Sequence, residues 1–206
     1  MGPATSIDSE NTHSTSTELR LRWRSNGEVN RHRRHEGAES VATLFIFAGL
    51  PGTGKTTLSR LLARKLQVTH LRIDTVEQAL RDLCNLSVGG EGYRLTYRIA
   101  SDILNLGMDV VVDSCNPIEL TRREWEQVAE DCEAEYVNIE LVCSDNSEHR
   151  RRVEDRTSDI PGLSLPSWAD VDSREYHAWT TERIVIDTSS SPIDECFREL
   201  WMKLKL

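Results

Sequence analysis

Apolar and polar residues follow two different periodicities from about Val41 onward. Short runs of β-branched and aromatic residues, typical of buried strands, are separated by segments whose apolar residues recur three and four positions apart, as in amphipathic helices. The expected strands cover 43–48, 70–74, 109–113, 136–143 and 183–186, and the expected helices cover 57–66, 76–84, 93–106, 119–131, 148–156, 173–181 and 193–204. Strands that alternate with helices predict an α/β fold, in which a five-stranded parallel sheet carries helices on both faces.

The first forty residues have a different composition. They are rich in Ser, Thr, Asn and Arg and contain few apolar residues. Such a segment buries too little surface to offset the entropy that ordering costs. We therefore expect a disordered polar extension over residues 1–40 and one domain over residues 41–206. The basic cluster at residues 31–35 is most simply a solvated part of that extension, with a phosphate- or nucleic-acid-binding arm as the alternative.

The most specific motif lies between the first strand and the first helix. Residues 49–56 match G-x-x-x-x-G-K-[ST] at every defined position. In this phosphate-binding loop the backbone N–H groups and the helix N-terminus face the phosphates, the lysine reaches the terminal phosphates, and the Ser/Thr hydroxyl is placed on Mg²⁺. The motif predicts a nucleoside triphosphate, taken as ATP, bound with Mg²⁺. Its expected contacts come from Gly49, Leu50, Pro51, Gly52, Thr53, Gly54, Lys55, Thr56 and Thr57.

Two aspartates stand at the ends of expected strands. Asp113 follows three valines, as in a Walker B strand, and is a candidate Mg²⁺ ligand together with Thr56. The next residue is Ser114 rather than a glutamate that would activate water, which favours transfer to an acceptor over hydrolysis. Asp74 ends the second strand, where its carboxylate would lie in the ligand crevice and take a proton from an acceptor hydroxyl. Its structural alternative is the N-cap of the helix that follows.

A group of arginines precedes a Pro/Gly/Ser-rich stretch. Arg152 and Arg156 fall on one face of the expected helix at 148–156, and we interpret residues 150–172 as a small helical lid whose arginines stabilise charge during phosphoryl transfer. A surface helix with local salt bridges is the alternative. Asp159-Ile160-Pro161-Gly162 resembles a GTPase D-x-x-G motif, but it follows a helix rather than a strand and does not indicate guanine binding.

Charge and hydropathy narrow the possible partners. The formal net charge of −9 argues against a broad nucleic-acid surface, which needs a basic face. No apolar run reaches the ~18 residues of a transmembrane helix, and the five cysteines are scattered without a C-x-x-C pair. These features predict a cytoplasmic protein with reduced thiols and no membrane partner. A monomer or weak homodimer is the expected state.

The loop, the aspartate after the second strand and the arginines at 150, 152 and 156 together resemble a known group. The chain is similar, from about Leu44 to its C-terminus, to the small P-loop kinases that include zeta toxins, chloramphenicol phosphotransferase and polynucleotide kinases, often described as AAA-family ATPases. The resemblance implies that Asp74 is the general base and that Arg152 and Arg156 are lid arginines. Relatives often carry Asp-x-x-Arg, whereas Glu77 stands at the fourth position here, with Arg72 or Arg81 as conceivable substitutes. Acceptor contacts are expected near Tyr93, Arg94 and Tyr97.

These observations predict a kinase. Its reaction would move the γ-phosphate of Mg-ATP to a hydroxyl of a small metabolite or antibiotic, with Lys55, Asp74, Arg152 and Arg156 as catalytic residues. Three alternatives stay open: a 5′-hydroxyl nucleic-acid kinase with a basic channel from Arg31 to Arg34, a zeta-like kinase of nucleotide-sugars, and a nucleotide-binding switch without turnover.

Overall fold

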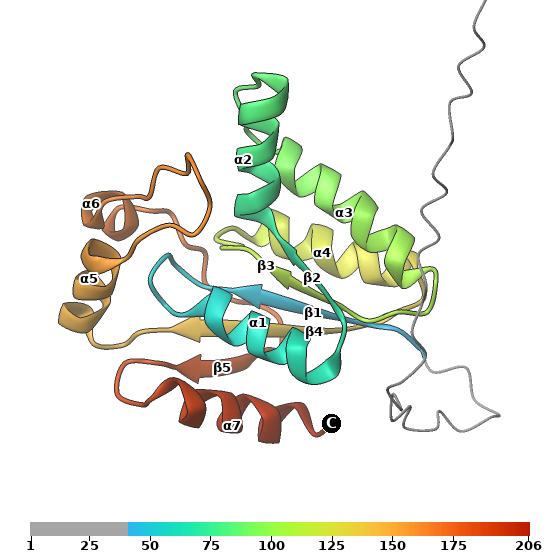
Figure 1. Cartoon of the computed structure of the whole chain (residues 1–206). Helices are drawn as coiled ribbons and strands as arrows, with labels where there is room; N and C mark the ends of the chain where they lie inside the picture. The colour runs from blue at the N-terminus through green and yellow to red at the C-terminus, as the bar shows by residue number, and fades with distance from the viewer. Residues whose placement is uncertain (1–40) are drawn as a thin grey trace, which may run out of the picture. The chain divides into compact units, whose positions relative to one another are not determined.

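The computed structural model describes residues 41–206, so the expected extension over residues 1–40 and its basic cluster lie outside the described residues. The described part is an α/β domain with a central sheet (Figure 1). Its strands are β1 (Thr43–Ala48), β2 (Thr69–Arg72), β3 (Val110–Asp113), β4 (Glu135–Val142) and β5 (Ile184–Asp187). Its helices are α1 (Lys55–Leu66), α2 (Ile73–Cys84), α3 (Glu91–Leu104), α4 (Glu119–Asp131), α5 (Asn146–Asp155), α6 (Trp168–Asp172) and α7 (Ile193–Leu204).

The sheet has five strands in the order β2-β3-β1-β4-β5, and every neighbouring pair is parallel. The prediction of a five-stranded parallel sheet is therefore confirmed. Because parallel strands need crossover connections, all five carboxyl ends meet at one edge of the sheet, where ligands of open α/β folds bind. This edge carries the loop after β1, the end of β2 and Asp113 at the end of β3.

Helices cover both faces because the central strands are apolar on both sides. Leu44 and Ile46 of β1 pack with residues of α3 and α4 on one face, whereas Phe45 and Phe47 pack with residues of α1 and α7 on the other (Figure 1). The alternation follows from the two-residue period of a strand. A strand buried on both faces reads as a continuous apolar run, which is why β1 and β3 were predictable. Among the described residues, no helix has the length and apolarity to cross a membrane.

Two parts of the predicted secondary structure were wrong. Strand β2 ends at Arg72 and α2 begins at Ile73, so Asp74 lies in the first helical turn instead of ending the strand. The N-cap of α2 is Arg72, which rules out the capping alternative for Asp74. The helix expected at 173–181 does not form; instead α6 begins after Ser167, whose capping box with Asp170 starts a helix there. The segment after α6 has no regular secondary structure, and it is anchored to α4 because Arg122 donates hydrogen bonds to the carbonyls of His177 and Ala178.

Candidate functional site

The phosphate-binding loop connects β1 to α1 at the carboxyl edge of the sheet. Gly49 has φ +134°, and a Cβ atom there would lie 2.2 Å from the Leu141 carbonyl oxygen of β4. Its amide donates a 3.0 Å hydrogen bond to the Cys115 carbonyl, which ties the start of the loop to the end of β3. Only glycine tolerates both the backbone angle and the close contact. The loop is therefore locked between two neighbouring strands.

The end of the loop presents unpaired donors. Gly54, the N-cap of α1, has no side chain that caps the helix. Within the described residues the Thr57 amide donates to the Gly54 carbonyl at 3.1 Å, whereas the Lys55 and Thr56 amides have no such acceptor. The Lys55 side chain is buried, and its ammonium group donates a 2.9 Å hydrogen bond to the Leu50 carbonyl inside the loop. Amides at a helix N-terminus and a lysine beside them form an anion-binding site.

Residues of α5 brace the loop from outside. His149 Nε2 donates to the Pro51 carbonyl at 2.8 Å, and the His149 ring packs edge-on against Trp168 of α6. A Cβ on Gly52 would lie 2.7 Å from a Val153 methyl carbon, so α5 packs directly on the loop. Thr188, after β5, donates to the Thr53 carbonyl at 3.1 Å. Side chains of three distant elements therefore hold the loop in shape.

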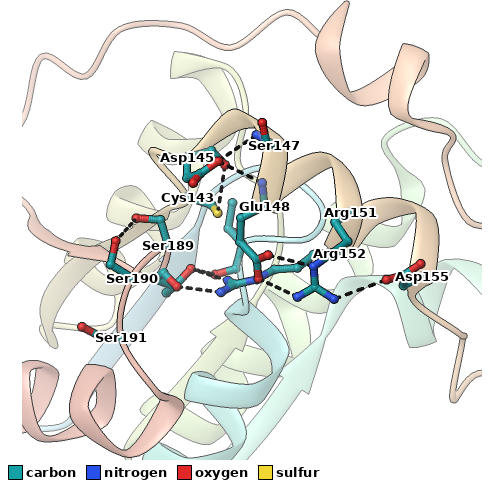
Figure 2. Close-up of polar contacts among 12 residues, drawn as sticks. Cys143, Asp145, Ser147, Glu148, Arg151, Arg152, Asp155, Ser189, Ser190 and Ser191 are labelled. Carbon is teal, nitrogen blue, oxygen red and sulfur yellow. Dashed lines mark hydrogen bonds and ion pairs between the residues drawn. The ribbon is translucent and has the colours of Figure 1, made fainter.

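Arg152 is part of this support (Figure 2). Its guanidinium donates to the Thr188 hydroxyl at 2.9 Å and to the Thr188 carbonyl at 2.8 Å, and its Nε donates to Glu148 at 2.7 Å. Hydrogen bonds from Arg151 and Arg152 lower the pKa of Glu148 to about 2. Arg152 lines the cavity, yet most of its donors are already used. Arg156, one residue beyond α5, also lines the cavity and has no ion-pair partner among the described residues.

Asp113 lies at the end of β3 and lines the cavity. Its side chain is buried, and its Oδ2 atom has no hydrogen-bond partner in the described part of the chain. Its nearest cationic neighbour is Arg72 Nε at 3.8 Å, beyond hydrogen-bond distance, so this oxygen retains the capacity to accept a ligand. Asp113 and Thr56 line the same cavity. Both are oxygen donors of the kind that Mg²⁺ takes beside nucleotide phosphates, so these residues fit the ion. No group of three or more potential metal-ligating side chains occurs among residues 41–206.

Arg72 occupies the centre of the site. Its backbone pairs with Asp113 in the register of β2 and β3. Its guanidinium nitrogens lie 3.8 Å from Asp113 Oδ2 and 3.7 Å from Asp74 Oδ2. One of them donates a 2.7 Å hydrogen bond to Asp159. Arg72 therefore connects the expected metal ligand, the expected base and the segment after α5.

A single cavity of about 1000 Å³ contains these groups. Its lining includes Lys55, Thr56 and Asp113, together with Asp74 and Glu77 from the N-terminal part of α2. Residues 156–159 and 162–166 also line it, and we call residues 156–166 the flap. The flap reaches α2, since a Cβ on Gly162 would lie 3.1 Å from the Gln78 side-chain nitrogen. Figure 1 shows this connection between α5 and α6 extending toward α2.

The acceptor contacts expected at Tyr93, Arg94 and Tyr97 do not lie in the cavity. Tyr97 packs against Trp125 with ring centroids 4.4 Å apart, and its hydroxyl donates to Glu124. Tyr93 accepts a hydrogen bond from the Asn116 amide, and Arg94 is exposed. The reason is that the apolar face of α3 turns toward the sheet, where its aromatic residues complete the core.

The sequence did not reveal the importance of three residues that line the cavity. Arg72 was named only as a substitute for the arginine of the Asp-x-x-Arg pattern, and Arg60 and Asp159 had no assigned role. Arg60 lies one helical turn beyond the loop, and its guanidinium donates to Asp159 at 2.6 Å. Asp159 belongs to the D-x-x-G sequence at residues 159–162, which follows a helix and is therefore not a GTPase motif. Arg60, an arginine close to the phosphate-binding loop, was the available sequence signal for this contact. Its partner Asp159 is 99 residues away, so the sequence could not identify the pair.

Glu77 differs from the arginine common in the resembling group, and the structure shows its surroundings. Its carboxylate accepts a 3.1 Å hydrogen bond from Arg81, and burial raises its pKa. Its side chain packs on Gly92 of α3. Glu77 thus helps to join α2 to α3, while Arg72 supplies a guanidinium close to Asp74.

Comparison with known proteins agrees with this geometry. A family model described as an AAA domain matches residues 44–164, from β1 through the flap. The chain belongs to this family. The L-seryl-tRNA(Sec) kinase of Methanococcus maripaludis is 27% identical over 157 residues, which are 71% of this chain and 59% of that protein. The chain therefore spans less than two thirds of the length of this curated relative.

Solved structures share the fold. A Chloroflexus aurantiacus protein superposes with a TM-score of 0.63 at 21% identity, covering 82% of this chain and 98% of its own. The Mycobacterium tuberculosis APS kinase CysC, in complex with AMPPNP and APS, has a TM-score of 0.58 at 20% identity, covering 80% and 98%. Kti12 of Chaetomium thermophilum, in complex with ADP-AlF3, has a TM-score of 0.57 at 18% identity, covering 77% and 97%. The predicted membership of the P-loop kinase group is thus confirmed.

Proposed function

We propose that this protein is an ATP- and Mg²⁺-dependent phosphotransferase that moves the γ-phosphate to a hydroxyl group of a small acceptor. The observation that carries the proposal is the convergence of the phosphate-binding loop, Asp113, Asp74 and Arg72 on one cavity. A site that only binds a nucleotide would not need Asp74, a second carboxylate besides Asp113, next to Arg72. Phosphoryl transfer needs both a phosphate cradle and a group that orients the attacking hydroxyl.

The nucleotide would bind at the loop. The free amides at the start of α1 would contact the phosphates, and Lys55 would exchange its hydrogen bond with the Leu50 carbonyl for one with a terminal phosphate. Thr56 and Asp113 are the residues that would hold Mg²⁺, which would supply positive charge to offset that of the phosphates. The nucleotides in the APS kinase and Kti12 structures support this assignment.

The acceptor would bind between α2 and the flap. Asp74 is partly exposed to the cavity, so its carboxylate can accept the proton of an incoming hydroxyl as the oxygen attacks phosphorus. Arg72 lies beside Asp74, with a guanidinium nitrogen 3.7 Å from Asp74 Oδ2, so it can help to orient this carboxylate. Ser114 follows Asp113 in place of a water-activating glutamate, which supports transfer over hydrolysis.

The two lid arginines would have different roles. Arg152 is bound to Thr188 and Glu148, so we assign it to holding the loop and α5 in position. Arg156 has donors available at the cavity and is the better candidate for neutralising charge in the transition state. The catalytic arginine of the lid would then be Arg156, with Arg152 acting through the loop that it supports.

A seryl group carried on RNA is a second candidate acceptor. It is favoured by one observation, the similarity to L-seryl-tRNA(Sec) kinase. The net charge of −9 and the partial coverage of that relative favour a small acceptor instead. Five free cysteines support our further proposal of a cytoplasmic location.

The test is release of ADP from Mg-ATP in the presence of a panel of acceptors. The panel would hold nucleosides, sugars, sugar acids, aminoglycoside and phenicol antibiotics, nucleotide-sugars, a 5′-hydroxyl oligonucleotide and seryl-tRNA. Acceptor-dependent release that the Lys55→Ala variant lacks would support the kinase and name its acceptor class. Tight ATP binding without stimulation by any acceptor would favour a nucleotide-binding switch.

A further inference from the structure

Asp159 of the flap bridges two arginines that belong to different elements. Its two carboxylate oxygens accept hydrogen bonds from Arg60 of α1 at 2.6 Å and from Arg72 of β2 at 2.7 Å. Hydrogen bonds from Arg72 and Arg60 lower the pKa of Asp159. One anionic group thus sits between two guanidiniums at the mouth of the cavity that contains the phosphate-binding loop.

Arg72 is fixed in place, but only one side-chain hydrogen bond, to Asp159, is formed by its guanidinium within the described residues. Its side chain is only 10% exposed, and its Nε atom, which has no hydrogen-bond partner in the described residues, faces Asp113 Oδ2 at 3.8 Å. Asp74 and Asp113 lie at 3.7 and 3.8 Å, beyond hydrogen-bond distance. A buried guanidinium that directs donors into a cavity and bonds directly to one flap residue is suited to binding a ligand.

Asp159 is the more replaceable partner. Its side chain is 51% exposed and comes from the flap, whereas Arg72 belongs to the sheet. A half-exposed ion pair contributes roughly 0.2–1 kcal/mol, which a more highly charged ligand exceeds. Arg81, Arg156 and Arg174 also line this cavity, although the chain as a whole carries a net charge of −9. Seven lysine or arginine side chains and five aspartate or glutamate side chains line the cavity, so positive charge is in slight excess there, opposite to the balance of the whole chain.

We propose that the Arg60–Arg72 pair is a binding site for an anionic group, either phosphate, sulfate or carboxylate, and that Asp159 fills this site until such a ligand displaces it. The inference deepens the proposed function and rests on it, because the anion belongs to a substrate of that reaction. Two substrates carry the required chemistry: the terminal phosphate of the nucleotide and a charged group on the acceptor itself. If the acceptor supplies it, the substrate class is a hydroxyl compound that is already anionic.

The test measures binding of inorganic phosphate by calorimetry, with the full chain saturated in turn with Mg-ADP and with Mg-AMPPNP. We expect Asp159→Asn to tighten phosphate binding roughly two- to fivefold, because the competing charge is removed while the side chain keeps its shape. Asp155→Asn is the matched control, since Asp155 is an exposed acid of α5 that pairs with Arg151. Arg60→Gln should weaken binding by a similar factor, and Arg64→Gln, an exposed arginine one turn along α1, should leave it unchanged.

The two nucleotides separate the two sources of the anion. Phosphate that binds with Mg-ADP and no longer binds with Mg-AMPPNP occupies the position of the terminal phosphate. Phosphate that still binds with Mg-AMPPNP, and does so through Arg60, occupies a site for an anionic acceptor. All variants would first be checked for an unchanged melting temperature; Arg60 and Asp159 were chosen because both are partly exposed.

Three results would overturn the inference: equal affinities for Asp159→Asn and Asp155→Asn, equal affinities for Arg60→Gln and Arg64→Gln, or no measurable phosphate binding with either nucleotide. None of these readings uses turnover. If turnover depends on Lys55 but the affinity for phosphate does not change in Asp159→Asn, the anion site is refuted and the proposed function is not. A chain that binds phosphate as expected but turns over no acceptor would refute the proposed function instead.

Discussion

The two halves of the cavity, which we propose bind the nucleotide (the nucleotide half) and the acceptor (the acceptor half), are built in different ways. The nucleotide half consists mainly of backbone: the loop after β1 and the first turn of α1, which come from one continuous segment of sequence. The acceptor half consists of side chains from β2, α2 and the flap, among them Arg72, Asp74 and Asp159. These residues are up to 87 positions apart in the chain.

The difference has a consequence for function. A backbone cradle binds the phosphates that all nucleoside triphosphates share, so the same loop serves many proteins. Side chains can be exchanged one at a time, so the acceptor half can change its substrate without a change of fold. Glu77, at the position where the resembling kinases often carry an arginine, lies in this half and pairs with Arg81, while Arg72 lies close to Asp74.

The largest expected effect is on the nucleotide half. Lys55→Ala should lower acceptor-dependent ADP release by roughly 10³-fold, because it removes a preorganised positive charge from the transferring phosphate. The measurement is steady-state turnover with the best acceptor from the panel. Lys65→Ala, at the far end of α1, is the control and should retain full activity. A loss below tenfold for Lys55→Ala would contradict its assigned role.

A change at Asp74 should separate the two halves. Asp74→Asn is expected to slow transfer about 10²- to 10⁴-fold, because the amide cannot accept the proton, while ATP affinity stays unchanged. Single-turnover rates and calorimetric titration with AMPPNP measure the two quantities. Asp102→Asn on the exposed face of α3 controls for loss of charge. Full transfer activity in Asp74→Asn would show that another group orients the acceptor.

The backbone character of the nucleotide half can be tested by adding one carbon. Gly49→Ala should lower the free energy of unfolding by about 3 kcal/mol, because its Cβ would collide with the Leu141 carbonyl oxygen. Gly107→Ala is the matched control: φ is also positive there, but no atom lies within 4 Å of the added carbon. We expect this control to cost about 1 kcal/mol, from the backbone angle alone. Equal losses in urea denaturation would show that the contact with β4 is unimportant.

The smallest expected effect concerns the support of the loop by α5. Glu148 has a pKa of about 2 in the folded protein against 4.5 as a reference, so its stabilising contribution is complete above pH 4.5 and disappears as the pH falls to about 2. Glu148→Gln should therefore have a lower melting temperature than the natural chain at pH 7. The difference should shrink as the pH falls through this window.

Thermal unfolding followed by circular dichroism between pH 2 and pH 7 measures this effect. Glu154→Gln is a useful control on the same helix, since Glu154 pairs with the exposed Arg150 and does not contact Arg152. A difference between Glu148→Gln and the natural chain that is constant with pH would mean that the Arg152–Glu148 pair does not set the stability of α5.

The sequence by itself determined the parallel sheet, the phosphate-binding loop and the aspartate at the end of β3. Each of these depends on local pattern: apolar runs buried on both faces, glycines at fixed spacing and a strand that ends in a carboxylate. It did not determine which side of α3 faces the core, so Tyr93 and Tyr97 were placed with the acceptor, although Tyr97 packs against Trp125 and Tyr93 packs against Tyr97.

Only the tertiary structure decided how the arginines are used. Arg152 and Arg156 are four residues apart, and the sequence offered no reason to distinguish them. Both line the cavity, but Arg152 donates to the hydroxyl and carbonyl of Thr188, whereas Arg156 has no ion-pair partner among the described residues. Arg72 and Asp159 meet across 87 residues, a distance over which neither helical nor strand periodicity carries information. Local periodicity specifies elements and the loops between them, whereas the pairing of charges depends on which elements the fold brings together.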